Sequence, residues 1–324
     1  MKLRNILCIL LSAATMVSCR NGADNISRGQ GFSFDTYTNV TVCGENSSAI
    51  LGEVQDRLSE ISGDFSLCYD TAANKLPEND LYRLCIAETK ALNRLYGDKI
   101  NITCGSLTGL WGISTEAPKV PGQAEISEAL TNMTDTNYPG NTADFPDGVK
   151  LDFGAVAKGC ACDVIYTLLT GADYAVVSLS STTLLYGSKP GGEKFRTAVT
   201  DPKSGEGYLG IIETDAAFIS TSGGYERFFE ADGQTYSHIL DMETGMPVET
   251  DLVSVTVIVP ADTPNGGIKS DFLSTLIYIE GTENLEKWLS REEIQIIAAD
   301  ENGFVYTNCG GFSLDENSKY KYGN

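Results

Sequence analysis

Residues 175–215 read AVVSLSSTTLLYGSKPGGEKFRTAVTDPKSGEGYLGIIETD and contain three strand-like runs with no helical pattern between them. The runs cover residues 175–180, 195–200 and 208–215, and a fourth, LVSVTVIVP, covers residues 252–260. Each is rich in β-branched and other apolar residues and is bounded by turn-forming residues. A doubly wound parallel sheet would place a helix between successive strands, so this order favours an α+β fold with a largely antiparallel sheet.

Helix-like patterns flank these strands along the chain. Apolar residues recur at spacings of three and four within residues 49–62, and again within residues 79–96 behind an Asn-Asp cap. A shorter helix is expected after Pro121, because proline is favoured in the first turn of a helix. Two further helices are expected near residues 154–169 and 268–280.

The chain has 324 residues and a formal net charge of −21, from 44 acidic and 23 basic side chains. Such an acidic protein repels a nucleic-acid backbone, which excludes binding through a basic face. A phosphate-bearing ligand would need a metal ion or a helix N-terminus to offset the same repulsion. No linker, repeat or low-complexity stretch interrupts residues 32–314, which predicts one domain followed by a charged tail at 315–324.

The N-terminal residues have the pattern of an export signal. A short apolar stretch follows two positive residues, which predicts a signal peptide over residues 1–18 rather than a membrane span. A cysteine after a small residue at this junction looks like a bacterial lipobox, so we expect a lipid on Cys19 and a polar tether over residues 19–31. The protein is then exported and lipid-anchored to the bacterial cell membrane, facing the periplasm or exterior. Because Met16 replaces the usual leucine, cleavage without lipidation is the alternative.

Nine cysteines are present, of which Cys8 and Cys19 belong to the signal and its junction. The remaining seven are an odd number, so they cannot form a complete disulfide framework. Cys160 and Cys162 lack the second pair that would complete a zinc site. We expect most of the seven to be small core residues.

Three segments combine residue types that can carry chemistry. The first, LDFGAVAKG at residues 151–159, places a carboxylate before small residues at the start of a helix. Such a start lets a ligand approach the backbone closely and offers N–H groups to an anion. The alternative is structural: Asp152 caps the helix and the glycines allow close packing.

The second segment, SHILDMETGMP at residues 237–247, contains the single histidine of the chain. His238 titrates near neutral pH and can accept a proton from an attacking hydroxyl. Asp241 lies three residues later and could orient the ring if the segment forms a turn. The alternative is a histidine that only satisfies the hydrogen bonds of that turn.

The third segment, SDFLST at residues 270–275, places Asp271 and Thr275 four residues apart on one helix face. A carboxylate and a hydroxyl are hard oxygen ligands that suit magnesium. The alternative is a solvated helix face. The apolar neighbours predict instead that this helix is largely buried, and a buried carboxylate needs a partner.

Taken together, these segments resemble the FAD:protein FMN transferases of the ApbE type, which are exported and often lipid-anchored flavin-transferring enzymes. Further matches follow in the family's order: FDT at 34–36, LWG at 110–112, STSGGYERFF at 220–229, SVTVIVP at 254–260 and SDFLSTLIYIEG at 270–281. The resemblance covers most of the chain and implies a single α+β, T-fold-like domain over residues 32–314, with a largely antiparallel sheet flanked by helices.

The resemblance also implies a reaction. FMN would move from FAD to a Thr or Ser hydroxyl of a partner protein with Mg²⁺ bound, and AMP would be released. The partner is expected to be a subunit of an electron-transfer complex. His238 would be the general base, with Asp241 beside it. The implied metal ligands are the Ala155 carbonyl, Asp271, Ser274 and Thr275, and the implied FAD contacts are Phe34, Tyr69, Asn101, Asp152, Lys158 and Leu240.

Some residues depart from the family pattern. Asn101 replaces an acidic FAD contact, and Ser180-Ser181 replaces a glycine pair. These changes concern FAD affinity more than the chemistry. Two alternatives stay open: hydrolysis of FAD to FMN and AMP by water, and a lipid-anchored protein that binds FAD without turnover. Because His238 and the implied metal ligands Asp271 and Thr275 are all present, the sequence favours an enzyme over a protein that only binds FAD.

Overall fold

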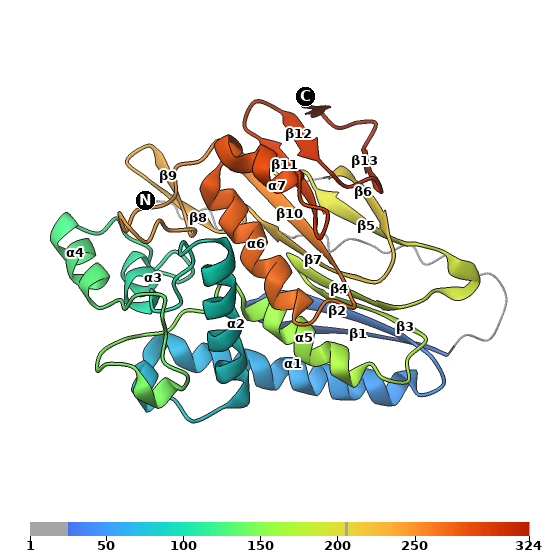
Figure 1. Ribbon diagram of the computed structural model, residues 1–324, viewed down its shortest axis with the longest axis horizontal. Helices are drawn as coiled ribbons and strands as arrows, with labels where there is room; N and C mark the ends of the chain where they lie inside the picture. The colour runs from blue at the N-terminus through green and yellow to red at the C-terminus, as the bar shows by residue number, and fades with distance from the viewer. Residues whose placement is uncertain (1–24, 205–206, 324) are drawn as a thin grey trace.

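The computed structural model describes residues 25–204 and 207–323, and it shows an α+β fold built on a nine-stranded sheet (Figure 1). Neighbouring strands are antiparallel except for the last pair at one edge, which is parallel. In sheet order the strands are β1 (Ile26–Ser33), β2 (Thr36–Cys43), β3 (Tyr174–Leu179), β4 (Thr182–Gly187), β7 (Ala217–Ser222), β10 (Leu252–Pro260), β11 (Gln295–Asp300), β12 (Phe304–Thr307) and β14 (Lys321–Tyr322). The predicted fold class is confirmed.

Two smaller sheets accompany the large one. β13 (Phe312–Leu314), β6 (Tyr208–Thr214) and β5 (Phe195–Thr200) form a three-stranded sheet, and β8 (Phe228–Ala231) pairs with β9 (Gln234–Ser237). The three-stranded sheet packs on one face of the large sheet through an apolar cluster that joins Ile212 to Ile258 and Ile297. The consecutive strands of residues 175–215 are therefore divided between two sheets.

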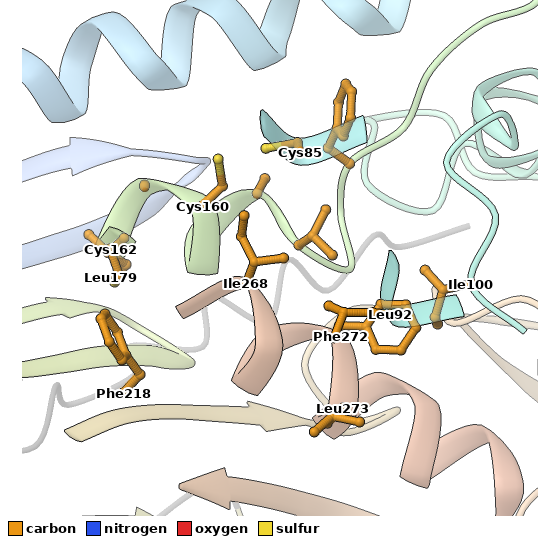
Figure 2. Packing of buried hydrophobic residues seen from close by; sticks show 14 of the residues in the cluster. Cys85, Leu92, Ile100, Cys160, Cys162, Leu179, Phe218, Ile268, Phe272 and Leu273 are labelled. Atoms are coloured by element: carbon orange, nitrogen blue, oxygen red, sulfur yellow. The ribbon is translucent and has the colours of Figure 1, made fainter. Parts of the chain in front are cut away.

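The helices are α1 (Ser47–Asp70), α2 (Asp80–Tyr96), α3 (Gly105–Trp111), α4 (Gln123–Thr131), α5 (Ala157–Leu168), α6 (Gly266–Glu280) and α7 (Leu285–Leu289). Helices α1, α5 and α6 pack against the other face of the large sheet, whereas α3 and α4 lie beyond its end, beside the β8–β9 hairpin (Figure 1). Figure 2 shows part of the main core, where Phe218 of β7 lies near side chains of α5 and α6. α1 extends past its predicted end because Phe65 and Cys68 continue its buried stripe.

The close contact between α5 and α6 positions the candidate active site. A Cβ on Gly159 would lie 2.2 Å from the Gly267 carbonyl oxygen, and a Cβ on Gly267 would lie 2.3 Å from that of Gly159. Only glycine therefore permits this approach of the two helices. The Asp163 carboxylate of α5 also accepts hydrogen bonds of 2.8 Å from the N–H groups of Gly267 and Ile268, which caps the start of α6.

The two ends of the predicted domain need correction. The tether predicted over residues 19–31 is wrong from Ile26 onward, because Ile26–Ser33 pairs residue by residue with β2 despite its polar composition. The tail predicted at 315–324 is also partly packed: Tyr320 is buried, and Lys321–Tyr322 pairs with β12. The signal peptide and Cys19 lie outside the described residues.

The seven cysteines of the described residues are all buried, as expected of core residues. Figure 2 shows three of them, Cys85, Cys160 and Cys162, among apolar side chains of the main core. Within residues 25–204 and 207–323, no helix has both the length and the apolar composition needed to cross a membrane.

Candidate active site

A cavity of about 240 Å³ lies among the β1–β2 turn, α1, α3, the loop entering α5, the end of β7 and α6. Segments far apart in the sequence contribute to its wall. The predicted residues that line it are Phe34, Tyr69, Asn101, Asp152, Ala155, Lys158, His238, Leu240, Asp271 and Thr275. Asp241 and Ser274 are not part of the wall. The fold thus gathers most of the predicted site around one cavity.

Asp271 lies on α6 with its carboxylate against the start of α5. One oxygen, Oδ2, accepts a 2.9 Å hydrogen bond from the Gly159 N–H, and Oδ1 accepts a 3.4 Å bond from the Thr182 hydroxyl. Asp271 is 4% exposed and forms no ion pair in the described part of the chain. Burial raises the pKa of its carboxyl, against the lowering effect of Lys158. A buried carboxylate with this environment favours a bound cation.

The other donors around Asp271 are hard oxygens. Thr275 stands one turn later on α6 and lines the same cavity. The Ala155 carbonyl, in the loop before α5, accepts no hydrogen bond from any residue within 25–204 and 207–323. A carboxylate, a hydroxyl and an unpaired carbonyl suit Mg²⁺, which keeps water or phosphate oxygens at its other positions. No cluster of three acidic, histidine or cysteine side chains occurs in the described chain, so a metal here would depend on this mixed set.

Ser274 does not belong to that set, contrary to the prediction. Its hydroxyl contacts the Ser222 hydroxyl at 2.8 Å and donates to the Asp271 carbonyl at 2.9 Å. Ser274 is fully buried, and helical geometry points it away from the cavity toward β7. It connects α6 to the sheet.

His238 is held by a backbone carbonyl. The Arg227 carbonyl oxygen accepts from both the His238 backbone N–H and its ring Nδ1, each at 3.1 Å. A carbonyl only accepts, so Nδ1 carries the ring proton and Nε2 is left as an acceptor. Burial, reinforced by the charges of Arg227 and Lys158, lowers the pKa of His238 from 6.5 to about 4. The ring is therefore neutral at neutral pH and offers Nε2 as a base.

Asp241 does not orient that ring, so its predicted role is wrong. Its Oδ1 accepts 2.7 and 2.8 Å bonds from the N–H groups of Glu243 and Thr244. The same turn closes through Gly245, whose φ of 71° favours glycine. Asp241 shapes the loop that carries His238, and the orienting contact comes from Arg227.

Two aromatic residues of the predicted flavin site stand at the cavity wall. Phe34 occupies the β1–β2 turn with a φ of 56°, a conformation costly for a bulky side chain. Its N–H donates to the Ser62 hydroxyl at 2.8 Å, and its ring lies 6.3 Å from that of Phe65. Tyr69 is half exposed at the end of α1, and the nearby Asp152 charge raises the pKa of its phenol. Exposed aromatic surface of this kind can stack on a flavin or adenine ring.

Asp152 and Leu240 reach the cavity from opposite loops. The Asp152 carboxylate accepts a 2.7 Å bond from the Gly154 N–H, so it shapes the loop before α5. The structural alternative considered for LDFGAVAKG is thus partly right, although Asp152 also lines the cavity. Leu240 is buried beside Leu107 and Trp111.

Asn101 also lines the cavity, but its side-chain amide is hydrogen-bonded to other residues of the protein. Its Oδ1 accepts from the Thr103 N–H at 2.9 Å and from the Thr103 hydroxyl at 2.7 Å, and its Nδ2 donates to the Thr134 carbonyl at 2.8 Å. The side chain joins two loops, which leaves little capacity for a ligand.

Two residues of the cavity region, Arg227 and Glu226, were missed from the sequence, and Ser181 was noted there only as a departure from the family pattern. The Arg227 guanidinium donates to the Ser114 hydroxyl at 3.2 Å and to the Phe34 carbonyl at 3.4 Å, and it lines the cavity without an ion pair in the described chain. Glu226 lines the cavity beside it, and burial raises the pKa of its carboxyl. Ser181 accepts a hydrogen bond from the Lys158 ammonium. The motif STSGGYERFF contains both charged residues, but nothing in it indicates which way they point.

Comparison with known proteins identifies a family and relatives of this chain. The model of the ApbE family matches residues 34–298. The chain is similar to the FAD:protein FMN transferase of Vibrio cholerae, with 28% identity over 87% of this chain and 89% of that protein. It is also similar to the FAD:protein FMN transferase of Treponema pallidum, with 32% identity over 58% of this chain and 56% of that protein.

Solved structures share the fold. The ApbE protein of Thermotoga maritima superposes with a TM-score of 0.73 at 24% identity, over 90% of this chain and 97% of that one. The flavinyl transferase ApbE of Pseudomonas stutzeri, in its apo form, gives a TM-score of 0.71 at 24% identity, over 92% and 97% of the two chains. The large sheet with helices on one face is therefore an arrangement found in other proteins.

Proposed function

Because this chain belongs to the ApbE family, we propose that it is an FAD:protein FMN transferase, which moves FMN from FAD onto a Thr or Ser hydroxyl of a partner protein and releases AMP. Relatives that carry this name support the flavin transfer. The observation that carries the proposal is the shared cavity: His238, with Nδ1 hydrogen-bonded and Nε2 left as an acceptor, lines the same cavity as Asp271 and Thr275.

His238 is the general base of this proposal. Its Nε2 takes the proton of the acceptor hydroxyl as that oxygen attacks the phosphorus of the FMN half. The Arg227 carbonyl keeps the ring proton on Nδ1, so the ring presents the correct nitrogen throughout. A positioned base of this kind contributes about 10²–10⁴ to a rate.

The diphosphate of FAD must enter a protein of net charge −21. Asp271, Thr275 and the Ala155 carbonyl would hold Mg²⁺, which when bound offsets the charge of the diphosphate. Lys158 and Arg227 add two cationic side chains to the same wall. Phe34 and Tyr69 offer ring surface, and Asp152 and Leu240 also line the cavity.

The test is a paired assay on the chain from Arg20. The protein is incubated with FAD, Mg²⁺ and a domain that carries a flavinylation site, and both AMP and the acceptor mass are measured. We expect AMP together with an FMN-sized mass increase, and loss of both in H238A and D271N. D56N, at an exposed position of α1, is the matched control for the lost carboxylate.

Other outcomes of this assay would contradict the proposal in different ways. AMP and free FMN without any modified acceptor would indicate FAD hydrolysis. Tight FAD binding without AMP would indicate a flavin-binding protein. A candidate acceptor from an electron-transfer complex is the first to test, on the strength of the family resemblance.

We also propose that the protein is exported and attached to the membrane through a lipid on Cys19. The support is the sequence pattern of residues 1–19. C19A in the full-length chain is expected to move the protein from the membrane fraction to the soluble fraction after export. Unchanged membrane association of C19A would contradict the anchor while leaving the transferase proposal intact.

A further inference from the structure

Ser181 lies beside a cationic side chain of the cavity wall. It belongs to the two-residue turn between β3 and β4, and its carbonyl accepts a 2.8 Å hydrogen bond from the Thr221 N–H of β7. Its hydroxyl oxygen accepts a hydrogen bond from the Lys158 ammonium. The Glu226 carboxylate lines the same cavity as Lys158.

The two charged partners do not pair directly. Neither Lys158 nor Glu226 forms an ion pair within 4.0 Å among the described residues, although the charge of Lys158 acts to lower the pKa of the Glu226 carboxyl against the effect of burial. Both side chains line the cavity. Lysine has a flexible stem and three N–H donors, so one bond to Ser181 fixes the ammonium and leaves two donors for another partner.

Removing the Ser181 hydroxyl has a predictable consequence. Lys158 would lose the hydrogen bond that anchors its ammonium. Partly buried opposite charges in the wall of one cavity then gain by direct pairing. A direct pair would neutralise Lys158 and occupy donors that otherwise face the cavity.

We propose that Ser181 is a positioning residue that keeps Lys158 apart from Glu226, so that the ammonium stays available to the diphosphate of FAD. The inference rests on the proposed function for the identity of the ligand. It assigns a role in substrate binding to a hydroxyl that itself need not touch the substrate.

The test compares two flavins that differ in the diphosphate. FAD and riboflavin are titrated against the wild type, S181A and S181T by flavin fluorescence, without metal and with Mg²⁺. S181A is expected to weaken FAD about tenfold or more, the scale of a lost hydrogen bond to a charged group. Riboflavin, which has no phosphate, should bind S181A as it binds the wild type, and S181T should restore FAD binding.

A second variant separates positioning from general damage. In S181A/E226Q no carboxylate remains to capture Lys158, so FAD affinity should recover relative to S181A. K158M should lose as much FAD affinity as S181A, and S181A/K158M should lose no more than K158M alone. S180G, in the same turn, is the matched control, because no side-chain contact joins Ser180 to Lys158.

The outcomes are distinguishable. Equal FAD affinity in S181A and wild type, equal loss of FAD and riboflavin, or no recovery in S181A/E226Q would overturn the inference. A wild type that does not bind FAD would overturn both this inference and the proposed function. A wild type that binds FAD but modifies no acceptor would contradict only the proposed function, and the affinities would still decide the role of Ser181.

Discussion

At the residue scale, the chemistry depends on which nitrogen of His238 bears a proton. The Arg227 carbonyl fixes Nδ1 as the donor, while burial and two nearby cations keep the ring neutral. The sequence indicated the histidine because it is the only one, yet it pointed to Asp241 as the orienting group. A backbone carbonyl eleven residues earlier leaves no trace in side-chain spacing, so this contact could not be predicted.

The pH dependence of transfer follows from that environment. Since the pKa of His238 is lowered from 6.5 to about 4, the active neutral ring persists down to that value, and kcat/KM should fall only as pH decreases through it. R227M removes one charge that opposes protonation, so the acid limb should move to higher pH. The measurement is a kcat/KM profile from about pH 4 to pH 8.

R196M is the control for R227M, because Arg196 lies on the surface and pairs with Glu213. Its profile should match that of the wild type. Two results would contradict the assigned environment of His238. One is a fall of wild-type kcat/KM near pH 6.5, and the other is a kcat/KM profile of R227M that falls at the same pH as that of the wild type.

At the element scale, the site depends on how α5 approaches α6. The periodic helices α1 and α2 were predictable because their apolar stripes recur at helical spacing. Strand β1 was not, because ISRGQGFS is polar and becomes a strand only through its pairing with β2. The glycines of α5 and α6 were visible in the sequence, but only the fold shows that Gly159 and Gly267 face one another.

G159A is expected to destabilise the protein by about 1–3 kcal/mol, because the added methyl group would overlap the Gly267 carbonyl. This cost opposes the gain of about 1 kcal/mol that alanine normally brings to a helix. Equilibrium unfolding in denaturant measures the difference. The same variant should weaken the bond from the Gly159 N–H to Asp271 and reduce transfer.

Gly63 of α1 provides the matched comparison. A Cβ there meets no atom within 4 Å, so G63A should stabilise the protein by up to about 1 kcal/mol. If G159A proved as stable as the wild type, the close contact of α5 and α6 would not be the constraint described above.

At the scale of the whole molecule, buried carboxylates make stability depend on pH. Burial raises the pKa of Asp163 from 3.8 to about 7 despite its two backbone hydrogen bonds. A raised pKa in the folded state means that the folded protein binds this proton more tightly than the unfolded chain. The contribution of Asp163 to stability is therefore fully present below about pH 4 and is lost as pH rises toward 7.

D163N removes this titration but keeps one acceptor at the start of α6. The free energy of unfolding of the wild type, relative to D163N, should fall between about pH 4 and pH 7. Denaturant unfolding at several pH values measures it, with D56N as an exposed control. Parallel pH curves for D163N and the wild type would contradict the raised pKa.

The central claim is that one cavity combines a neutral histidine base with a cation site for a diphosphate. The most direct measurement is the intact mass of an acceptor domain after incubation with FAD, Mg²⁺ and either the wild type or H238A, with FAD affinity measured in parallel. The account predicts an FMN-sized increase with the wild type only, while both proteins bind FAD equally well. Equal modification by H238A, or none by a wild type that binds FAD and the acceptor, would contradict it.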